Sequence, residues 1–128
     1  MHTQHIDWSP RHHRGGQVSY LLLTKDQFSS RHLSITWVEG ALGSEQWLHA
    51  HPHNEQVYVI VRGQGLMKVS GEEQPVGPGT LVFVPPGKDH AIRNVGDEPL
   101  LYISATSPPF ELPAPETGRA YEPPPAAP

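Results

Sequence analysis

The 128-residue chain contains no cysteine, no long apolar run and no excess of basic residues. Without thiols, cysteine nucleophiles and thiolate zinc sites are excluded. Nine Lys and Arg against thirteen Asp and Glu give a net charge of -4, which does not favour nucleic-acid binding. The apolar runs fall far short of a membrane span, and the first residues lack the pattern of a signal peptide. We therefore expect one cytoplasmic domain without nucleic-acid or membrane partners.

Helical periodicity is missing as well, because no window of more than about ten residues shows a 3.6-residue period free of Gly, Pro and β-branched residues. Short β-rich runs separated by turn residues follow one another instead. The clearest expected strands are Val18–Thr24, Leu33–Val38, Val57–Val61, Leu66–Val69, Thr80–Val84, His90–Asn94 and Leu100–Ala105. Many short strands in one small domain predict an all-β sandwich or barrel with little helix.

Periodicity within these runs predicts which residues are buried. Val57–Val61 is continuously apolar and is expected to be a strand buried on both faces. Residues 63–65 read Gly-Gln-Gly, which predicts a hairpin turn. The candidates for the core or for a pocket wall are Trp37, Trp47, Met67 and Phe83.

The two ends of the chain differ from the middle. We expect an irregular arm over residues 1–16, a barrel over residues 17–106 and a proline-rich tail over residues 107–128. Eight of the last 22 residues are proline, a composition typical of extended, polyproline-like chain. Phe110 and Leu112 are the tail residues expected to pack on the barrel, with the last few residues loose.

Histidine is unusually frequent, with nine in the chain. His49 and His51 are two residues apart, which on a strand places both imidazoles on one face, about 7 Å apart. Glu55 and Gln56 follow at the start of the next strand and point to opposite faces, so only one of them can face a shared ion. His90 comes after the turn Pro85-Pro86-Gly87. This spacing predicts a metal site.

Two spaced motifs carry a resemblance to a known family. The first reads Gly43, five residues, His49-Ala50-His51, four residues, Gln56, six residues, Gly63. The second reads Gly79, five residues, Pro85-Pro86-Gly87, two residues, His90, three residues, Asn94. This pattern resembles the two cupin motifs over roughly residues 33–105, with Gln56 in the place of the family glutamate.

The resemblance implies a double-stranded β-helix, or jelly-roll barrel, that binds a small molecule. It also implies that one divalent transition metal (Fe, Mn, Ni, Co, Cu or Zn) is held by His49, His51, Gln56 and His90. Similar small cupins include dioxygenases, lyases, isomerases and polyketide cyclases, and cupins commonly form dimers. We therefore expect a homodimeric, metal-dependent enzyme, first of all a dioxygenase or related oxidoreductase acting on an enolisable or aromatic substrate.

Several alternatives stay open at this point. Glu55 is an alternative fourth ligand and also the nearest candidate for a general base. Tyr58 shares a face with Gln56 and is a candidate proton donor, although a buried tyrosine is more often packing. His53 is expected at the rim of the site. A non-redox isomerase, lyase or cyclase, and a binding protein without turnover, are the alternative functions.

Overall fold

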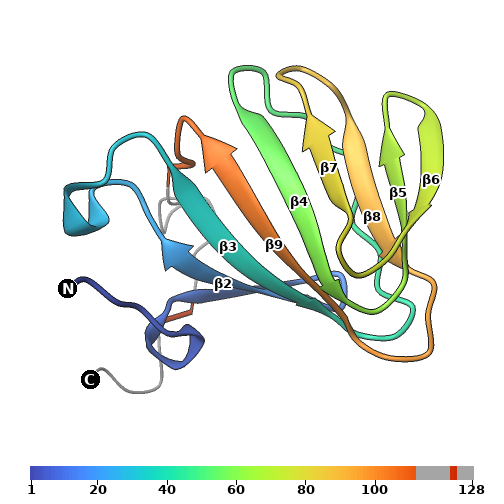
Figure 1. Ribbon diagram of the computed structural model, residues 1–128, viewed down its shortest axis with the longest axis horizontal. Helices are drawn as coiled ribbons and strands as arrows, with labels where there is room; N and C mark the ends of the chain where they lie inside the picture. Colours follow the sequence, from blue (N-terminus) through green and yellow to red (C-terminus); the bar gives the residue numbers. More distant parts are fainter. Residues whose placement is uncertain (112–121, 124–128) are drawn as a thin grey trace.

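The computed structural model describes residues 1–111 and 122–123, and its strands form two antiparallel sheets (Figure 1). The large sheet has the order β1-β2-β3-β9-β4-β7, and the small sheet has the order β6-β5-β8. The strands are β1 Arg11–Arg14, β2 Gln17–Leu23, β3 Ser34–Gly40, β4 Glu55–Arg62, β5 Gly65–Val69, β6 Glu72–Val76, β7 Leu81–Val84, β8 His90–Asn94 and β9 Leu100–Ser107. Two short 3-10 helices, η1 Ile6–Trp8 and η2 Gln27–Ser29, are the only helices in the described part of the chain. The all-β prediction is confirmed.

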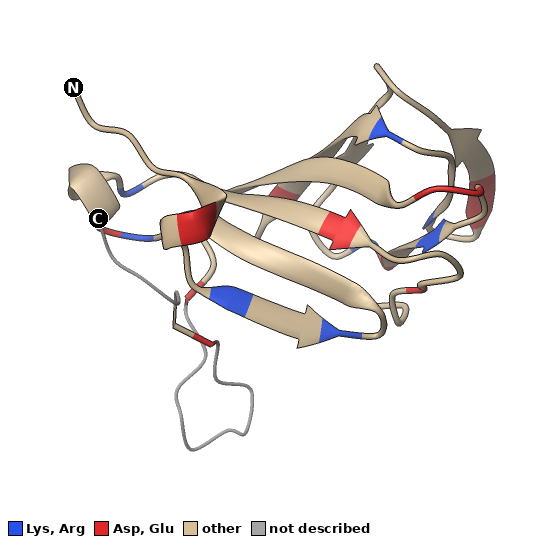
Figure 2. Ribbon diagram, turned by 90° about the horizontal axis from the view of Figure 1, so that it is seen from below, with Lys and Arg blue, Asp and Glu red and all other residues tan. Residues whose placement is uncertain are grey.

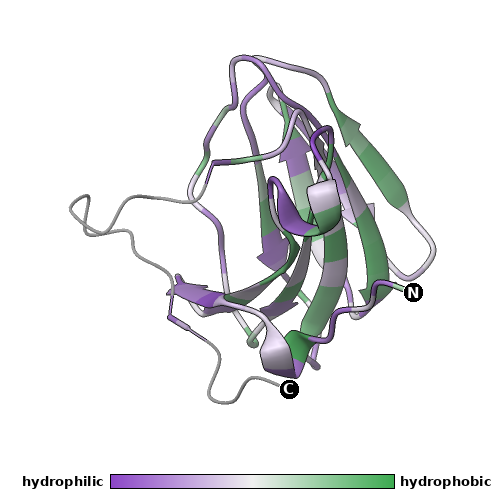
Figure 3. Ribbon diagram, turned by 90° about the vertical axis from the view of Figure 1, so that its left-hand side faces the viewer, coloured by the Kyte–Doolittle hydropathy of each residue, from purple (hydrophilic) through white to green (hydrophobic). Residues whose placement is uncertain are grey.

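The core lies between the inner faces of the two sheets. Along β4 and β9 every second residue is buried, as expected for strands with one covered face. The buried apolar side chains are Val38, Tyr58, Ile60, Met67, Val76, Val84, Ile92, Leu100 and Tyr102. Figure 3 shows the apolar stretches continuing along the strands, while Figure 2 shows charged residues mostly at strand ends and in loops.

The prediction of a hairpin at residues 63–65 is wrong. β4 pairs with β7 and β9, whereas β5 pairs with β6 and β8, so this connection crosses from one sheet to the other. Gly63 has φ of 89°, and a Cβ added there would come within 2.8 Å of the Pro99 carbonyl oxygen. The glycine is therefore needed for a tight crossing between sheets and not for a hairpin.

The outer face of β4 is more exposed than its apolar sequence predicted. Val57 and Val59 are only half-buried and Val61 is 44% exposed, so the expectation that this strand is buried on both faces is wrong. Phe83 is also exposed (51%) and lies on this face, because it pairs with Val57. An apolar run does not reveal whether both faces of its sheet are covered.

The other expected core residues have mixed outcomes. Met67 is buried, with 2% of its surface exposed, and Trp37 is half-buried on the outer face of β3. Trp47 is 75% exposed and packs only one face against the Arg14 guanidinium, 5.4 Å from the ring centre. Trp47 therefore lies outside the core, and Phe83 lies outside the core but lines a hollow between β6 and β7.

Segments near both ends of the described part of the chain join the large sheet. Arg11–Arg14, expected to be irregular, forms β1 and pairs with β2. Glu122 forms a bridge with Arg11 through two backbone hydrogen bonds. Phe110 packs as expected, whereas Leu112 and the last residues lie outside the described residues. Among the described residues, no helix has the length and hydropathy needed to cross a membrane.

Candidate metal centre

The segment before β4 runs alongside β8 and extends the small sheet. Glu45 bridges to Arg93, and His49 bridges to His90. The second bridge is reciprocal, because His49 N donates to His90 O at 3.1 Å and His90 N donates to His49 O at 2.8 Å. Two histidines far apart in the sequence are thus fixed side by side by backbone hydrogen bonds.

Three imidazoles meet where this segment faces the large sheet. One ring nitrogen each of His49, His51 and His90 lies within 4.8 Å of the others. The ring centres of His49 and His90 are 4.2 Å apart, and those of His49 and His51 are 5.1 Å apart. His90 is fully buried, whereas His49 and His51 are half-buried. The three expected histidine ligands therefore form one cluster, hereafter the histidine cluster.

Gln56 reaches the histidine cluster from the opposite sheet. Its side chain is buried on the inner face of β4, and Oε1 lies 3.1 Å from His90 Nε2. Its Nε2 donates to Ser104 Oγ at 2.6 Å on the neighbouring β9. For metal–ligand bonds of about 2.1 Å, adjacent ligands of an octahedral ion lie close to this separation.

Hydrogen bonds to the backbone set the proton positions on two of the rings. His49 Nδ1 lies 2.7 Å from Trp47 O, and His90 Nδ1 lies 3.1 Å from Lys88 O. A carbonyl oxygen can only accept, so each Nδ1 carries the proton and each Nε2 carries a lone pair. His90 Nε2 therefore directs its lone pair toward the Gln56 amide, 3.1 Å away. The donors present therefore fit a divalent ion bound by nitrogen and amide oxygen.

Burial favours the neutral form of the His51 and His90 imidazoles. Loss of solvent, together with neighbouring His49 and His90, lowers the pKa of His51 to about 4. Loss of solvent also lowers the pKa of His90, against the opposing effect of its bond to Lys88 O. Neutral imidazole is the form that binds metal, so in the metal-free protein these ligands do not have to lose protons at neutral pH.

The other expected site residues lie outside the histidine cluster. Glu55 is exposed on the face of β4 opposite to Gln56, and His53 is exposed in the turn after His51. Tyr58 is buried, its hydroxyl group donates to Gln46 Oε1 at 3.2 Å, and burial raises its pKa to about 12. A catalytic part for Glu55 or Tyr58 stays a prediction.

Tyr58 belongs to a second polar cluster beside the first, the tyrosine–glutamine network. Gln46 Nε2 donates to Tyr102 Oη at 3.1 Å, and Tyr102 in turn donates to Gln17 Oε1 at 3.3 Å. The rings of Tyr58 and Tyr102 stack with centres 4.9 Å apart. Gln46 also accepts from the backbone of Ile92 in β8, so the network ties both sheets together.

Comparison with known proteins identifies the family of this arrangement. The cupin domain model matches residues 36–106, which is more than half of the chain. The chain belongs to the cupin family. Protein MJ1618 of Methanocaldococcus jannaschii is 29% identical over 108 residues, covering 84% of this chain and 86% of its own length. The tetracenomycin polyketide synthase protein TcmJ of Streptomyces glaucescens is 31% identical over 110 residues, covering 86% of this chain and 72% of its own length.

Solved structures agree on the fold. An RmlC-like cupin from Shewanella frigidimarina superposes with a TM-score of 0.73 at 25% identity, covering 87% of this chain and 94% of that one. KdgF from Halomonas superposes with a TM-score of 0.75 at 17% identity, covering 87% and 96%. The cupin fold expected from the two motifs is therefore confirmed.

The fixed positions of the second cupin motif that are not ligands shape the backbone. Asn94 is buried, and its Nδ2 donates to the carbonyl oxygens of Gly40, Ala41 and Glu98. Gly87 has φ of 79° and donates its N–H to His51 O at 2.8 Å, in the turn before His90. Asn94 thus fixes the start of the connection that leads to His49, and Gly87 ties the turn before His90 to His51.

Sequence reasoning missed three residues that support the site. Ser104 accepts from the Gln56 amide, Gln46 organises the tyrosine–glutamine network, and Phe110 packs against His51 with ring centres 4.6 Å apart. Strand alternation places Ser104 in line with the buried residues of β9 and was the available signal. Gln46 and Phe110 lie outside the regular strands, where alternation gives no information.

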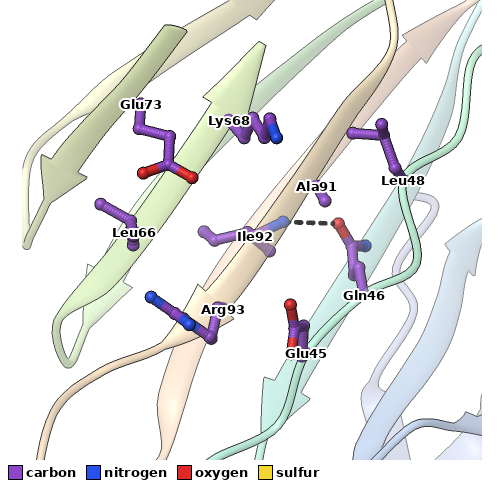
Figure 4. A pocket seen from close by; sticks show the side chains of 9 residues that line it. All are labelled: Glu45, Gln46, Leu48, Leu66, Lys68, Glu73, Ala91, Ile92 and Arg93. Atoms are coloured by element: carbon purple, nitrogen blue, oxygen red, sulfur yellow. Dashed lines mark hydrogen bonds between the residues drawn. The ribbon is translucent and has the colours of Figure 1, made fainter. Parts of the chain in front are cut away.

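Two hollows in the described part of the chain lie away from the histidine cluster. A groove of about 170 Å³ lies on the outer face of the small sheet, where Lys68 and Arg93 stand near Glu45 and Glu73 (Figure 4). A second hollow of about 260 Å³ lies between β6 and β7 and is lined by apolar residues such as Met67 and Val82. Val82 pairs with Tyr58, so this second hollow is one strand away from β4.

Proposed function

We propose that this cupin is a metal-dependent enzyme acting on enolisable or aromatic small molecules. The observation that carries the proposal is the convergence of one ring nitrogen each from His49, His51 and His90, all within 4.8 Å of one another, beside the buried Gln56 amide 3.1 Å from His90 Nε2. Three imidazoles beside an amide oxygen make a donor set that suits a divalent transition metal.

The four ligands in this proposal are three imidazoles and one amide, all uncharged. A divalent ion held by them keeps its full charge and acts as a Lewis acid that polarises a carbonyl or stabilises an enolate. A substrate that becomes anionic as it reacts is therefore preferred. An enolisable carbonyl compound meets this requirement, and so does a phenol or catechol.

Neighbouring groups of the protein orient the proposed metal ligands. The carbonyl groups of Trp47 and Lys88 hold His49 and His90 in the tautomer with Nε2 free. Ser104 holds the Gln56 amide beside His90. These contacts pre-organise the donors, so little ordering is needed when an ion and its substrate bind.

For the reaction, a dioxygenase remains our first proposal and a non-redox cyclase or isomerase the second. The second is supported by the similarity to a protein named as part of a tetracenomycin polyketide synthase. Polyketide chains carry several carbonyl groups that enolise, and the same metal centre would bind them in either reaction. The two proposals differ in whether molecular oxygen is consumed.

The test is an assay of metal-loaded protein, one metal at a time, with a panel of β-diketones and catechols. Oxygen uptake with Fe, Cu or Ni, abolished by His49→Ala and retained by His53→Ala, would support a dioxygenase. Loss of substrate without oxygen uptake would support the cyclase or isomerase. If every metal and substrate gave the rate of the His49→Ala control, the enzyme proposal would be rejected in favour of a binding protein.

A second copy of the chain is the proposed partner. The outer face of the large sheet exposes Val61, Leu81 and Phe83 by 44–59%, beside the half-buried Val57 and Val59. Apolar residues gathered on one face mark an association surface. Phe83→Asp should convert a dimer to a monomer in sedimentation experiments, and a monomeric wild-type protein would contradict the proposal.

A further inference from the structure

The three histidines of the cluster are not held in the same way. His49 and His90 are each oriented by an Nδ1 bond to a backbone carbonyl. Within residues 1–111 and 122–123, no such bond is found for the ring of His51. The His51 ring instead contacts three other rings. Its centre lies 4.6 Å from that of Phe110, 5.1 Å from that of His49 and 5.4 Å from that of His90. Of these, only Phe110 is not itself an expected ligand.

We propose that Phe110 is the positioning residue of His51 and does by packing what a carbonyl does for the other two histidines. This inference rests on the proposed metal centre. The two rings meet at an interplanar angle of 52°, a tilted contact typical of aromatic pairs. Because Phe110 stands against the imidazole, it limits rotation of the His51 ring and keeps its nitrogen directed at the other donors.

The segment that carries Phe110 is itself held at several points. Asn54 Nδ2 donates to Pro108 O at 2.6 Å, and Phe110 N donates to Ser34 Oγ at 3.2 Å. Ser107 Oγ donates to His32 O at 2.6 Å. These bonds come from the loop before β3, from β3 itself and from the turn that follows His51. The position of Phe110 is therefore set by the body of the protein.

Asn54 links the connection that follows His51 to the segment that carries Phe110. It lies three residues after His51, in the same connection between the ligand and β4, and it binds the backbone two residues before Phe110. The turn that carries the ligand thus also fastens the segment that positions it. A change at Asn54 should loosen Phe110 and, through it, His51, without removing any ligand atom.

The experiment measures binding of Co²⁺ alone, by calorimetric titration and by its visible absorption spectrum, which reports ligand geometry. Phe110→Ala should weaken Co²⁺ binding about 10-fold, the usual effect of removing a group that orients a ligand, and should alter the spectrum. Phe110→Leu keeps an apolar wall and should recover most of the affinity. Asn54→Ala should act in the same direction as Phe110→Ala, with a smaller effect.

Trp8→Ala is the control, since it removes an aromatic side chain from η1, where Trp8 contacts the ring of His5, and it should bind Co²⁺ like the wild type. Co²⁺ affinities and spectra of Phe110→Ala and Asn54→Ala that match the wild type would overturn the role of Phe110 and leave the metal centre intact. A wild-type protein that binds Co²⁺ no better than His51→Ala would overturn the metal centre, and the role of Phe110 with it. Circular dichroism of each variant shows that the fold is retained, and Phe110→Leu and Asn54→Ala provide the comparison if Phe110→Ala does not fold.

Discussion

Two polar clusters lie between the same two sheets, and they are built differently. In the tyrosine–glutamine network each tyrosine hydroxyl group donates to a glutamine oxygen, and Gln46 in turn donates to Tyr102. In the histidine cluster three ring nitrogens, one each from His49, His51 and His90, meet within 4.8 Å beside the Gln56 amide instead. The network is satisfied almost entirely by protein groups, whereas the cluster gathers groups that can bind a cation. The first arrangement is suited to stability and the second to binding.

The largest expected effect separates true ligands from nearby histidines. His49→Ala removes a proposed ligand and should weaken binding of a divalent transition metal by about 100-fold or more. His53→Ala, four residues away and exposed, should change the affinity by less than about twofold. Competition with a chromophoric chelator measures both affinities. Equal losses in the two variants would show that the histidine cluster is not the binding site.

A substitution in the tyrosine–glutamine network should lower stability and leave metal affinity unchanged. Tyr102→Phe leaves Gln46 Nε2 and Gln17 Oε1 without their partner in the interior, and should lower the free energy of unfolding by about 1–3 kcal/mol. Metal affinity should stay at the wild-type level, because Tyr102 has no contact with a proposed ligand histidine. Urea denaturation and the chelator competition together test this. A large loss of metal affinity with unchanged stability would reverse the roles of the two clusters.

Gln56→Glu tests the effect of site charge. A carboxylate at this position adds a negative charge to the ligand set, so a divalent ion should bind more tightly while an anionic ligand binds to that ion less tightly. We expect about 10-fold weaker binding of a β-diketonate to the loaded variant, measured by its absorption band. Gln56→Ala serves as the control without any oxygen donor. Tighter binding of the β-diketonate to the Glu variant would contradict the argument that neutral ligands favour an anionic substrate.

A pH dependence is expected for the metal-free protein. His51 has a pKa of about 4 in the fold, whereas an unperturbed histidine has a pKa of about 6.5. Between these values the unfolded chain binds more protons, so the contribution of His51 to stability is fully present above pH 6.5 and is lost as the pH falls to about 4. Urea denaturation in a chelating buffer should show this decrease in the wild type and less of it in His51→Ala. The same slope in both proteins would assign the pH dependence to other groups.

The sequence predicted the histidine cluster better than the surroundings of the site. Fixed spacings identified His49, His51 and His90 because each spacing corresponds to a turn or to a strand register that the fold preserves. The hairpin at residues 63–65 failed because two glycines can allow either a hairpin or a crossing between sheets. The prediction that Trp47 and Phe83 lie in the core failed because hydrophobicity does not tell which face of a sheet is covered. Phe110 was expected to pack, but its partner His51 depends on contacts between distant segments.

Binding of a divalent transition metal by the histidine cluster and Gln56 can be measured directly. The most direct measurement is the metal content of the wild-type protein and of His49→Ala, both purified without a histidine tag or added metal, by inductively coupled plasma mass spectrometry. The wild type should carry close to one equivalent of a single transition metal, and His49→Ala should carry little. Less than about a tenth of an equivalent in the wild type, with only weak rebinding of added metal, would contradict the claim.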